Sequence, residues 1–183
     1  LYHLLARGEA SGVHPVTRLD RDTFGVVILA KNANIHDRFC RMLRERQLEK
    51  TYLASVFGQP PQAEGQIDLP VYKIGGGNLI RIVDERGQQA LTRYRVLETA
   101  GQTALLELHP MTGRTHQLRL HCMASGFPIL GDPQYTSPES TAYSAAHGLF
   151  TQQLCAARLV FPHPMTGERM EILSRQAVFF PKD

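Results

Sequence analysis

Residues 17–31 read Thr-Arg-Leu-Asp-Arg-Asp-Thr-Phe-Gly-Val-Val-Ile-Leu-Ala-Lys, a charged segment that runs into an apolar one. The apolar run from 25 to 31 is of strand length and β-branched at its start, so it predicts a buried strand. Just before it, Asp20 stands between Arg18 and Arg21. A carboxylate between two cations suits a nucleophile or an electrostatic stabiliser, and a loop entering a rigid strand can hold it in place. A salt-bridged turn explains the same residues.

Two further segments predict helices. Residues 34–47 carry one apolar stripe at helical spacing, with arginines mostly off that stripe, so the apolar side should face the core. Residues 115–125 form a second candidate helix. The predicted boundary residues are Asn32 or Asn34 as the cap of the first helix, and Thr115 as the cap and Gly126 as the stop of the second.

The rest of the chain predicts short strands joined by turns. The predicted strands cover 52–57, 71–74, 79–83, 92–99, 104–109, 155–161 and 169–173. A hairpin turn is predicted at 75–78, and residues 127–150 are expected to be mostly loop because they are rich in Pro, Gly, Ser and Tyr. Many short strands with few helices indicate an α+β fold, with a mixed, mainly antiparallel sheet and a few flanking helices.

Composition sets the broad class. The chain has 183 residues, of which 43% are hydrophobic and 20% charged, so it is expected to form one globular domain and not to be disordered. No apolar run approaches the ~20 residues that span a bilayer, and no segment reads as a signal peptide. Three cysteines without a CxxC pair indicate neither a disulfide framework nor a zinc site and fit a reducing cytoplasm.

The net charge of +3 is small, but it is unevenly distributed. Residues 1–60 carry nine Lys and Arg against six Asp and Glu, whereas residues 61–183 carry eleven of each. Sixteen of the twenty basic residues are arginine, whose planar fork suits phosphate or carboxylate. Contact with nucleic acid, a solvated surface and a genomic preference for arginine codons all explain this pattern.

A second polar segment, residues 113–121, reads Gly-Arg-Thr-His-Gln-Leu-Arg-Leu-His at the start of the second predicted helix. Arg119 lies one helical turn beyond Thr115 and could point its guanidinium at a buried carboxylate. His116 and His121 are five residues apart, which is poor spacing for a metal pair on one helix face. Neither a HExxH motif nor a GxSxG nucleophile elbow occurs.

Taken together, five motifs occur in a fixed order along the chain. They are Arg18-Leu19-Asp20-Arg21-Asp22-Thr23-x-Gly25, Glu49-Lys50-Thr51-Tyr52-x-Ala54, Thr112-Gly113-Arg114-Thr115-His116-Gln117-Leu118-Arg119-x-His121, Gly126-x-Pro128-Ile129-x-Gly131-Asp132-x-x-Tyr135 and Phe161-Pro162-His163-Pro164. With these motifs, the sequence resembles the RluA-type pseudouridine synthases, named for the bacterial ribosomal large subunit. The resemblance runs from about residue 14 to 173.

The resemblance implies a cofactor-free isomerase that converts uridine in rRNA or tRNA to pseudouridine. It implies that Asp20 is the essential carboxylate, that Tyr52 stacks on the target base, and that Arg119 pairs with Asp20 in a charge-assisted contact that could be bidentate. Arg18 would fill the gap left by the flipped nucleotide, and Leu118 would form an apolar wall. The remaining candidate substrate-binding residues are Arg21, Arg114 and His116.

The resemblance also implies how the chain is organised. Residues 1–183 are expected to be a single catalytic domain without the family's usual N-terminal strand and without an N-terminal RNA-binding domain. The expected partner is an RNA stem-loop, with no membrane, no metal and no obligate protein partner, so a cytoplasmic monomer is expected. The family usually has a histidine where this chain has Thr17, and another where it has Cys155.

Two other functions compete with the isomerase. A non-catalytic RNA-binding or ribosome-assembly module would keep the arginine-rich surface without needing Asp20. A hydrolytic glycosidase would need two carboxylates about 5–10 Å apart, and only Asp22, flanked by arginines, lies near Asp20 in sequence. For the isomerase, attack of the carboxylate on C1′ and removal of the 2′ proton both remain open.

Overall fold

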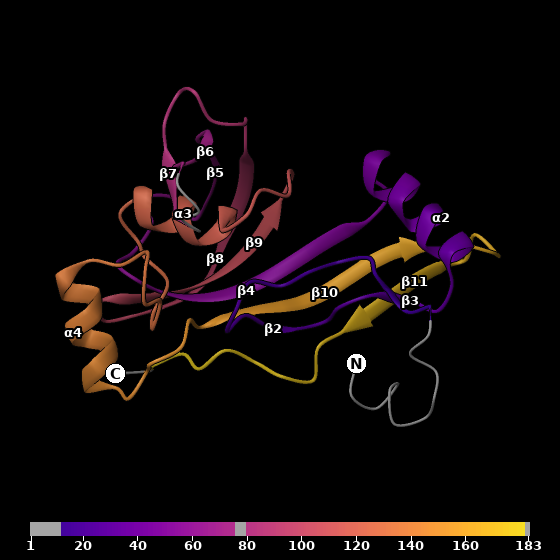
Figure 1. The fold of residues 1–183 in the computed structure, drawn as a ribbon. Helices are drawn as coiled ribbons and strands as arrows, with labels where there is room; N and C mark the ends of the chain where they lie inside the picture. Colours follow the sequence, from indigo (N-terminus) through magenta and orange to yellow (C-terminus); the bar gives the residue numbers. More distant parts are fainter. Residues whose placement is uncertain (1–11, 76–79, 182–183) are drawn as a thin grey trace.

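The computed structural model describes residues 12–75 and 80–181, and its main element is a seven-stranded sheet (Figure 1). Six strands follow one another in the order β11 (Arg169–Leu173), β10 (Leu154–Pro162), β4 (Glu49–Phe57), β9 (Thr103–Pro110), β8 (Leu91–Ala100) and β5 (Glu64–Asp68), all antiparallel, and β2 (Phe24–Gly25) pairs in parallel with β10. Two small pairs are β1 (His14–Pro15) with β3 (Leu29–Ala30), and β6 (Val71–Lys73) with β7 (Arg81–Val83). The helices are α2 (Ala33–Arg44), α3 (Gln117–Ala124) and α4 (Pro138–Ala146). The predicted α+β fold is confirmed.

The central strand β4 is covered on both faces. Ala54 and Val56 point to one face and are fully buried in the core cluster that includes Leu118 of α3. On the opposite face the Ser55 hydroxyl donates a hydrogen bond of 2.6 Å to the carbonyl of Phe179, so the C-terminal segment lies against that side. This alternation is what a strand in the middle of a sheet requires.

Helix α2 packs on β10, as its apolar stripe predicts. Phe39 and Met42 are buried and share a core cluster with Leu159 and Phe161 of β10. The side chain of Asn32 accepts a hydrogen bond of 3.0 Å from the amide of Ile35 and caps the helix, so the first of the two predicted caps is correct. The helix ends at Arg44 and not at the predicted residue 47.

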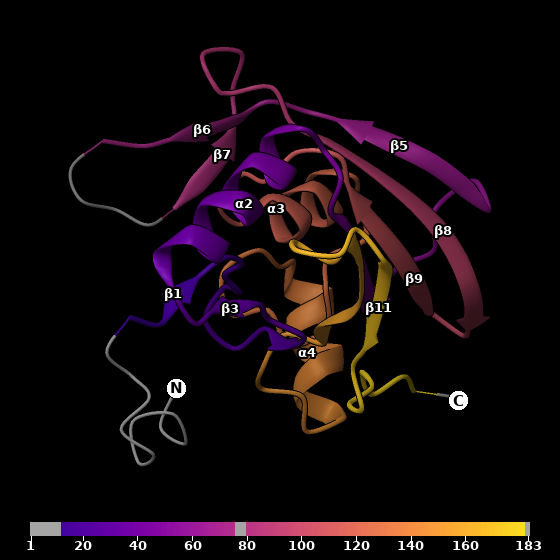
Figure 2. The ribbon, with the colours of Figure 1, turned by 90° about the vertical axis from the view of Figure 1, so that its right-hand side faces the viewer.

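Helix α3 packs on β4 and β9 but begins later than predicted. His116 precedes it in a left-handed conformation (φ 57°) and Gln117 is its first residue, so the prediction of Thr115 as the cap is wrong. Gly126 (φ 86°) follows the last turn and stops the helix, as predicted. Figure 1 shows α3 and α2 apart on the same side of the sheet, and in Figure 2, turned by 90°, one lies behind the other.

Helix α4 lies in the segment that was expected to be mostly loop, so that expectation is wrong for residues 138–146. The Ser137 side chain accepts a hydrogen bond from the Ser140 amide, and Pro138 occupies the first turn, where its missing N–H costs nothing. The other predicted strands are observed with small shifts of their ends. The predicted turn at 75–78 falls mostly outside the described residues.

The apolar run at 25–31 does not form one strand, so this prediction is also wrong. Gly25 has a left-handed backbone (φ 114°), and β2 ends there after two paired residues. The chain then leaves β10, and the carbonyl of Ile28 accepts a hydrogen bond of 2.9 Å from the amide of Val16. The segment therefore closes a loop over residues 16–28 instead of crossing the sheet.

Replacement of Gly25 should strongly destabilise the fold. A Cβ at this position would overlap the backbone of Ala156, and the positive φ adds strain for any L side chain. We expect Gly25→Ala to lower the free energy of unfolding by about 2 kcal/mol or more. Gly75→Ala is the control, because a Cβ there meets no atom within 4 Å. Urea denaturation measures both variants, and equal effects would contradict the packing described for β2.

Candidate active site

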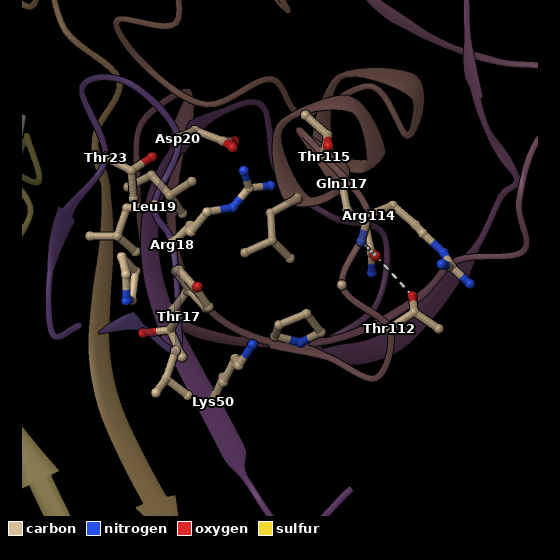
Figure 3. Close-up of a pocket in the computed structure, with 17 residues that line it drawn as sticks. Thr17, Arg18, Leu19, Asp20, Thr23, Lys50, Thr112, Arg114, Thr115 and Gln117 are labelled. Atoms are coloured by element: carbon tan, nitrogen blue, oxygen red, sulfur yellow. Dashed lines mark hydrogen bonds between the residues drawn. The ribbon is translucent and has the colours of Figure 1, made fainter. Parts of the chain in front are cut away.

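A cavity of about 540 Å³ opens above β4, between α3 and the loop before β2 (Figure 3). Lys50 and Tyr52 of β4 lie on its floor, because they point to the same face of the strand, and Leu118 of α3 forms part of its wall. Asp20 lies at one side of the ring of lining side chains and Lys50 at the opposite side (Figure 3). The volume of the cavity is in the range of small-ligand sites.

The loop that carries Asp20 is fastened at several points. The Gln152 side-chain amide donates a hydrogen bond of 3.0 Å to the carbonyl of Arg21 and another to the Thr23 hydroxyl. The amide of Thr23 donates to the carbonyl of Asp20 at 3.1 Å. Thr17, where the similar family usually has histidine, accepts a hydrogen bond of 2.9 Å from the amide of Ile28. These bonds hold the Asp20 carboxylate in a defined, partly exposed position.

Arg119 has two acidic partners, which are Asp20, as the resemblance implied, and Asp132, which the sequence analysis did not indicate. Arg119 forms its bidentate pair with Asp132, with Nε and Nη2 at 2.6 and 2.8 Å from the two carboxylate oxygens. Asp20 lies farther away, with its Oδ2 at 3.9 Å from Nη1 of Arg119. The prediction of a bidentate Asp20–Arg119 contact is therefore wrong, because Asp132 occupies the fork and leaves only Nη1 facing Asp20.

Asp132 is buried and fully hydrogen-bonded. Its Oδ1 also accepts bonds from the amides of Gln134 (2.9 Å) and Tyr135 (3.0 Å), and the Arg119 guanidinium lies 4.9 Å from the centre of the Tyr135 ring. Burial works against the charge on Arg119, but the hydrogen bonds and charge of Asp132 outweigh burial and raise the pKa of Arg119. Asp132 was not among the predicted site residues, although it belongs to the Gly131–Tyr135 motif.

Burial shifts the pKa values of the two floor residues in opposite directions, because it disfavours the charged form of each. Burial, helped by the charge of Asp20, raises the pKa of Tyr52 to about 12, so its phenol stays protonated at neutral pH. Burial lowers the pKa of Lys50. Lys50 was also missed as a site residue. Its position two residues before Tyr52, on the same face of β4, is the signal that could have identified it.

The structure brings together most of the predicted site residues, but not all. Arg18, Asp20, Tyr52, Arg114 and Leu118 line the cavity. Arg119 is not part of the lining, but its Nη1 lies 3.9 Å from the Asp20 carboxylate. Arg21 points away: its side chain is 88% exposed and lies 3.4 Å from the Asp22 carboxylate. His116 is outside the lining, with its Nδ1 at 3.0 Å from the Tyr135 hydroxyl.

Gln117 fixes the part of the wall that follows β9. Its side-chain oxygen accepts hydrogen bonds from the Arg114 amide (3.0 Å) and the Thr112 hydroxyl (2.8 Å). Its side-chain nitrogen therefore donates to the carbonyl of Leu91 and to the hydroxyl of Thr92, both at 3.0 Å. The start of α3 is thus tied both to the loop that lines the cavity and to β8.

The same network fixes the protonation of His121, which is fully buried. Its Nε2 donates to the carbonyl of Leu69 at 2.9 Å, and its Nδ1 accepts from the Thr92 hydroxyl at 2.9 Å. A second ring proton would face that hydroxyl. Burial lowers the pKa of His121, in agreement with a neutral ring.

Within residues 12–75 and 80–181, no group of three His, Cys, Asp or Glu side chains is arranged to hold a metal ion. The helices in this part of the chain are all too short or too polar to cross a bilayer.

Comparison with known proteins identifies the family. The family model described as RNA pseudouridylate synthase matches residues 2–124. The chain is 42% identical over 164 residues to the dual-specificity RNA pseudouridine synthase RluA of Salmonella typhi, covering 88% of this chain and 71% of that protein. It is 37% identical over 166 residues to the ribosomal large subunit pseudouridine synthase C of Vibrio vulnificus (strain CMCP6), covering 91% of this chain and 52% of that protein. The chain thus spans only about half the length of this second relative.

A solved structure agrees with these matches. Human RNA pseudouridylate synthase domain containing 1 is similar with a TM-score of 0.79 and 27% identity, over 96% of this chain and 74% of that one. The chain belongs to the RNA pseudouridylate synthase family.

The two acidic neighbours of Arg119 should contribute very differently to stability. Removal of Asp132 leaves a buried, uncompensated guanidinium, so we expect Asp132→Ala to lower the free energy of unfolding by about 3–5 kcal/mol. Asp20 is partly exposed and 3.9 Å away, so Asp20→Ala should change it by less than about 1 kcal/mol. Chemical denaturation of both variants tests this, and a larger loss for Asp20→Ala would contradict the pairing.

The neutral, buried His121 should make stability depend on pH. The unfolded chain binds a proton at this histidine near pH 6.5, whereas the folded chain does so only at lower pH. The stability that the neutral His121 ring contributes to the folded chain is therefore complete above pH 6.5 and is lost as the pH falls below that value. The pKa of His116 is also lowered, mainly by burial, and acts in the same direction. Between pH 7.5 and 5.5, His121→Gln should lose less unfolding free energy than the parent; an equal loss would show that His121 is not held neutral.

Proposed function

We propose that this chain isomerises uridine to pseudouridine in ribosomal or transfer RNA. The observation that carries the proposal is the position of Asp20 at the cavity, with the Tyr52 ring on the floor and Nη1 of Arg119 at 3.9 Å from the Asp20 carboxylate. The relatives named above are RNA pseudouridine synthases, one of them of dual specificity and one of the ribosomal large subunit.

The cavity suits a nucleotide that has left the RNA stack. Flipping a nucleotide out of a stack costs a few kcal/mol, and stacking on an aromatic ring returns on the order of 1–3 kcal/mol. Tyr52 offers such a ring, and its raised pKa keeps it uncharged. Leu118 adds an apolar wall, and Arg18, on the loop before Asp20, is placed to occupy the gap in the RNA.

The reaction needs one carboxylate close to the ribose. The bond between C1′ and N1 breaks, the uracil turns in the cavity, and a bond between C1′ and C5 forms. The proton leaves C5 and a proton is gained at N1, so substrate and product have the same composition and nothing is consumed. Asp20 either attacks C1′ and is later displaced, or removes the 2′ proton and returns it.

Arg119 supports this chemistry as a positioning residue and a counter-charge. Asp132 holds Nε and Nη2, which fixes the plane of the guanidinium and directs Nη1 at Asp20. Arg119 therefore supplies a positive charge beside the Asp20 carboxylate in either mechanism. Asp132 therefore acts on Asp20 through Arg119.

The cavity favours the isomerase over the two alternatives. Asp20 is the one carboxylate among the described residues that line it, so the pair of carboxylates that a glycosidase uses is not found there. A module that only binds RNA has no need for a fastened, ion-paired aspartate beside an aromatic floor.

We further propose that the chain is a single catalytic domain that acts as a monomer in the cytoplasm. Helices α2 and α3 pack on one sheet, and the cavity is lined by segments that range from Pro15 to Leu154. The cysteines at 40, 122 and 155 are free, which is typical of a reducing compartment.

Loss of the Asp20 carboxylate should abolish the activity without unfolding the protein. We expect Asp20→Asn to lower pseudouridine formation in transcripts of rRNA and tRNA by at least about three orders of magnitude, the scale seen when a catalytic nucleophile is removed. Nucleoside mass spectrometry after digestion measures the product, and circular dichroism checks the fold. The matched control is Asp22→Asn, which changes a nearby carboxylate outside the cavity lining. Wild-type activity in Asp20→Asn would rule out the proposed mechanism.

A further inference from the structure

A second cavity, of about 870 Å³, adjoins the first on the side of α2. The two cavities share five lining residues, from β4, from the end of β9 and from the segment that follows it. These residues are Lys50, Pro110, Thr112, Gly113 and Arg114. The second cavity continues from them to the end of α2 and to β8. The two hollows therefore form one continuous depression with Lys50 and Arg114 at the junction.

The second cavity is strongly basic. Its cations come from four different parts of the fold and are Arg44 and Arg46 at the end of α2, Lys50 of β4, Arg93 of β8 and Arg114 after β9. Among the described residues, Glu49 is the one carboxylate in its lining, and His109 lies opposite Arg93 in the β8–β9 pairing. Such a concentration of like charges is unfavourable for the folded chain by itself.

These five cations are not neutralised by an acidic side chain. Within the described residues, none of the five forms an ion pair, and the guanidinium of Arg114 donates to the carbonyl of Gln89. Five exposed or partly exposed arginines elsewhere do have acidic partners, in the pairs Arg21–Asp22, Arg86–Asp84, Arg95–Glu107, Arg158–Glu171 and Arg169–Glu171. What distinguishes these five cations is that they line one cavity, so an anionic ligand from outside the chain is the natural partner for their charges.

We propose that the second cavity binds the phosphodiester backbone of the RNA next to the flipped uridine, so that the RNA strand leaves the catalytic cavity toward α2 and β8. This inference rests on the proposed function and adds the path of the substrate. The continuity through Lys50 and Arg114 means that a nucleotide in the first cavity places its neighbour's phosphate at the second. Arginine forks suit phosphate oxygens, and Leu43, Leu48 and Met111 give the cavity an apolar surface for a base.

Salt-dependent RNA binding tests the proposal. The probe is a fluorescein-labelled RNA stem-loop with a uridine-rich loop, titrated by anisotropy between 50 and 500 mM KCl in the Asp20→Asn background. Each lost phosphate contact should lower the slope of log Kd against log[KCl] by about 0.7–0.9. Over a tenfold increase in KCl, the affinity of the variant should therefore fall about five- to eightfold less than the affinity of the parent. We expect this for Arg46→Ala and for Arg93→Ala, and about twice the change in slope for the double variant.

Each variant has a matched control. Arg41→Ala removes an exposed arginine of α2 that lines neither cavity, and Arg95→Ala removes an arginine of β8 that pairs with Glu107. Both should leave the slope unchanged. If Arg46→Ala and Arg93→Ala behave like these controls, or if the parent does not bind the probe at 50 mM KCl, the proposal is overturned.

The result separates this proposal from the proposed function. Pseudouridine formation is measured independently, in the Asp20-containing protein, with RNA below saturation. If the protein forms no pseudouridine while the Arg46 and Arg93 variants lose salt dependence, the catalytic proposal fails and the RNA path stands. If pseudouridine forms equally fast in the double variant and the parent, the RNA path fails and the catalytic proposal stands.

Discussion

The buried ion pair between Arg119 and Asp132 is the contact on which the geometry of the site depends. It joins α3 to the turn that follows Ile129, a residue that forms an isolated β-bridge with Val56 of β4. It also leaves one nitrogen of the guanidinium directed at Asp20. Because the Asp132 carboxylate also accepts two backbone N–H bonds, the pair is fully satisfied and has one arrangement. The position of the cation that faces Asp20 is therefore set by the fold and not by Asp20 itself.

The sheet determines where the cavities can form. Helices α2 and α3 pack on the same side of the sheet but over different strands, and between them Lys50 and Tyr52 of β4 are left without a helix above them. An irregularity in the β10–β4 pairing between Ala156 and Arg158 accompanies the change from the part of β10 beside α3 to the part beneath α2. The open stretch of β4 is the floor of the catalytic cavity, and its end beside α2 leads to the basic one.

Much of this could be predicted from local sequence patterns. The stripe of α2 and the hairpin of β8 and β9 are observed as predicted, and the motif residues Asp20, Tyr52 and Leu118 line one cavity. The continuous strand at 25–31 failed because an apolar run does not reveal the left-handed backbone at Gly25. Helix α4 was missed because its serines were interpreted as loop residues, although Ser137 and Pro138 are a helix-start signal. The bidentate pair of Arg119 with Asp132 was missed because it depends on a tertiary contact, which spacing along the chain does not specify.

The most direct test of the account is pseudouridine mapping of rRNA and tRNA from cells of the source organism that lack this gene. The account predicts at least one uridine that is unmodified in these cells, and that the purified chain converts it to pseudouridine in the isolated RNA whereas its Asp20→Asn form does not. If every pseudouridine of these RNAs remains in the deletion strain and the purified chain adds none, the central claim is contradicted.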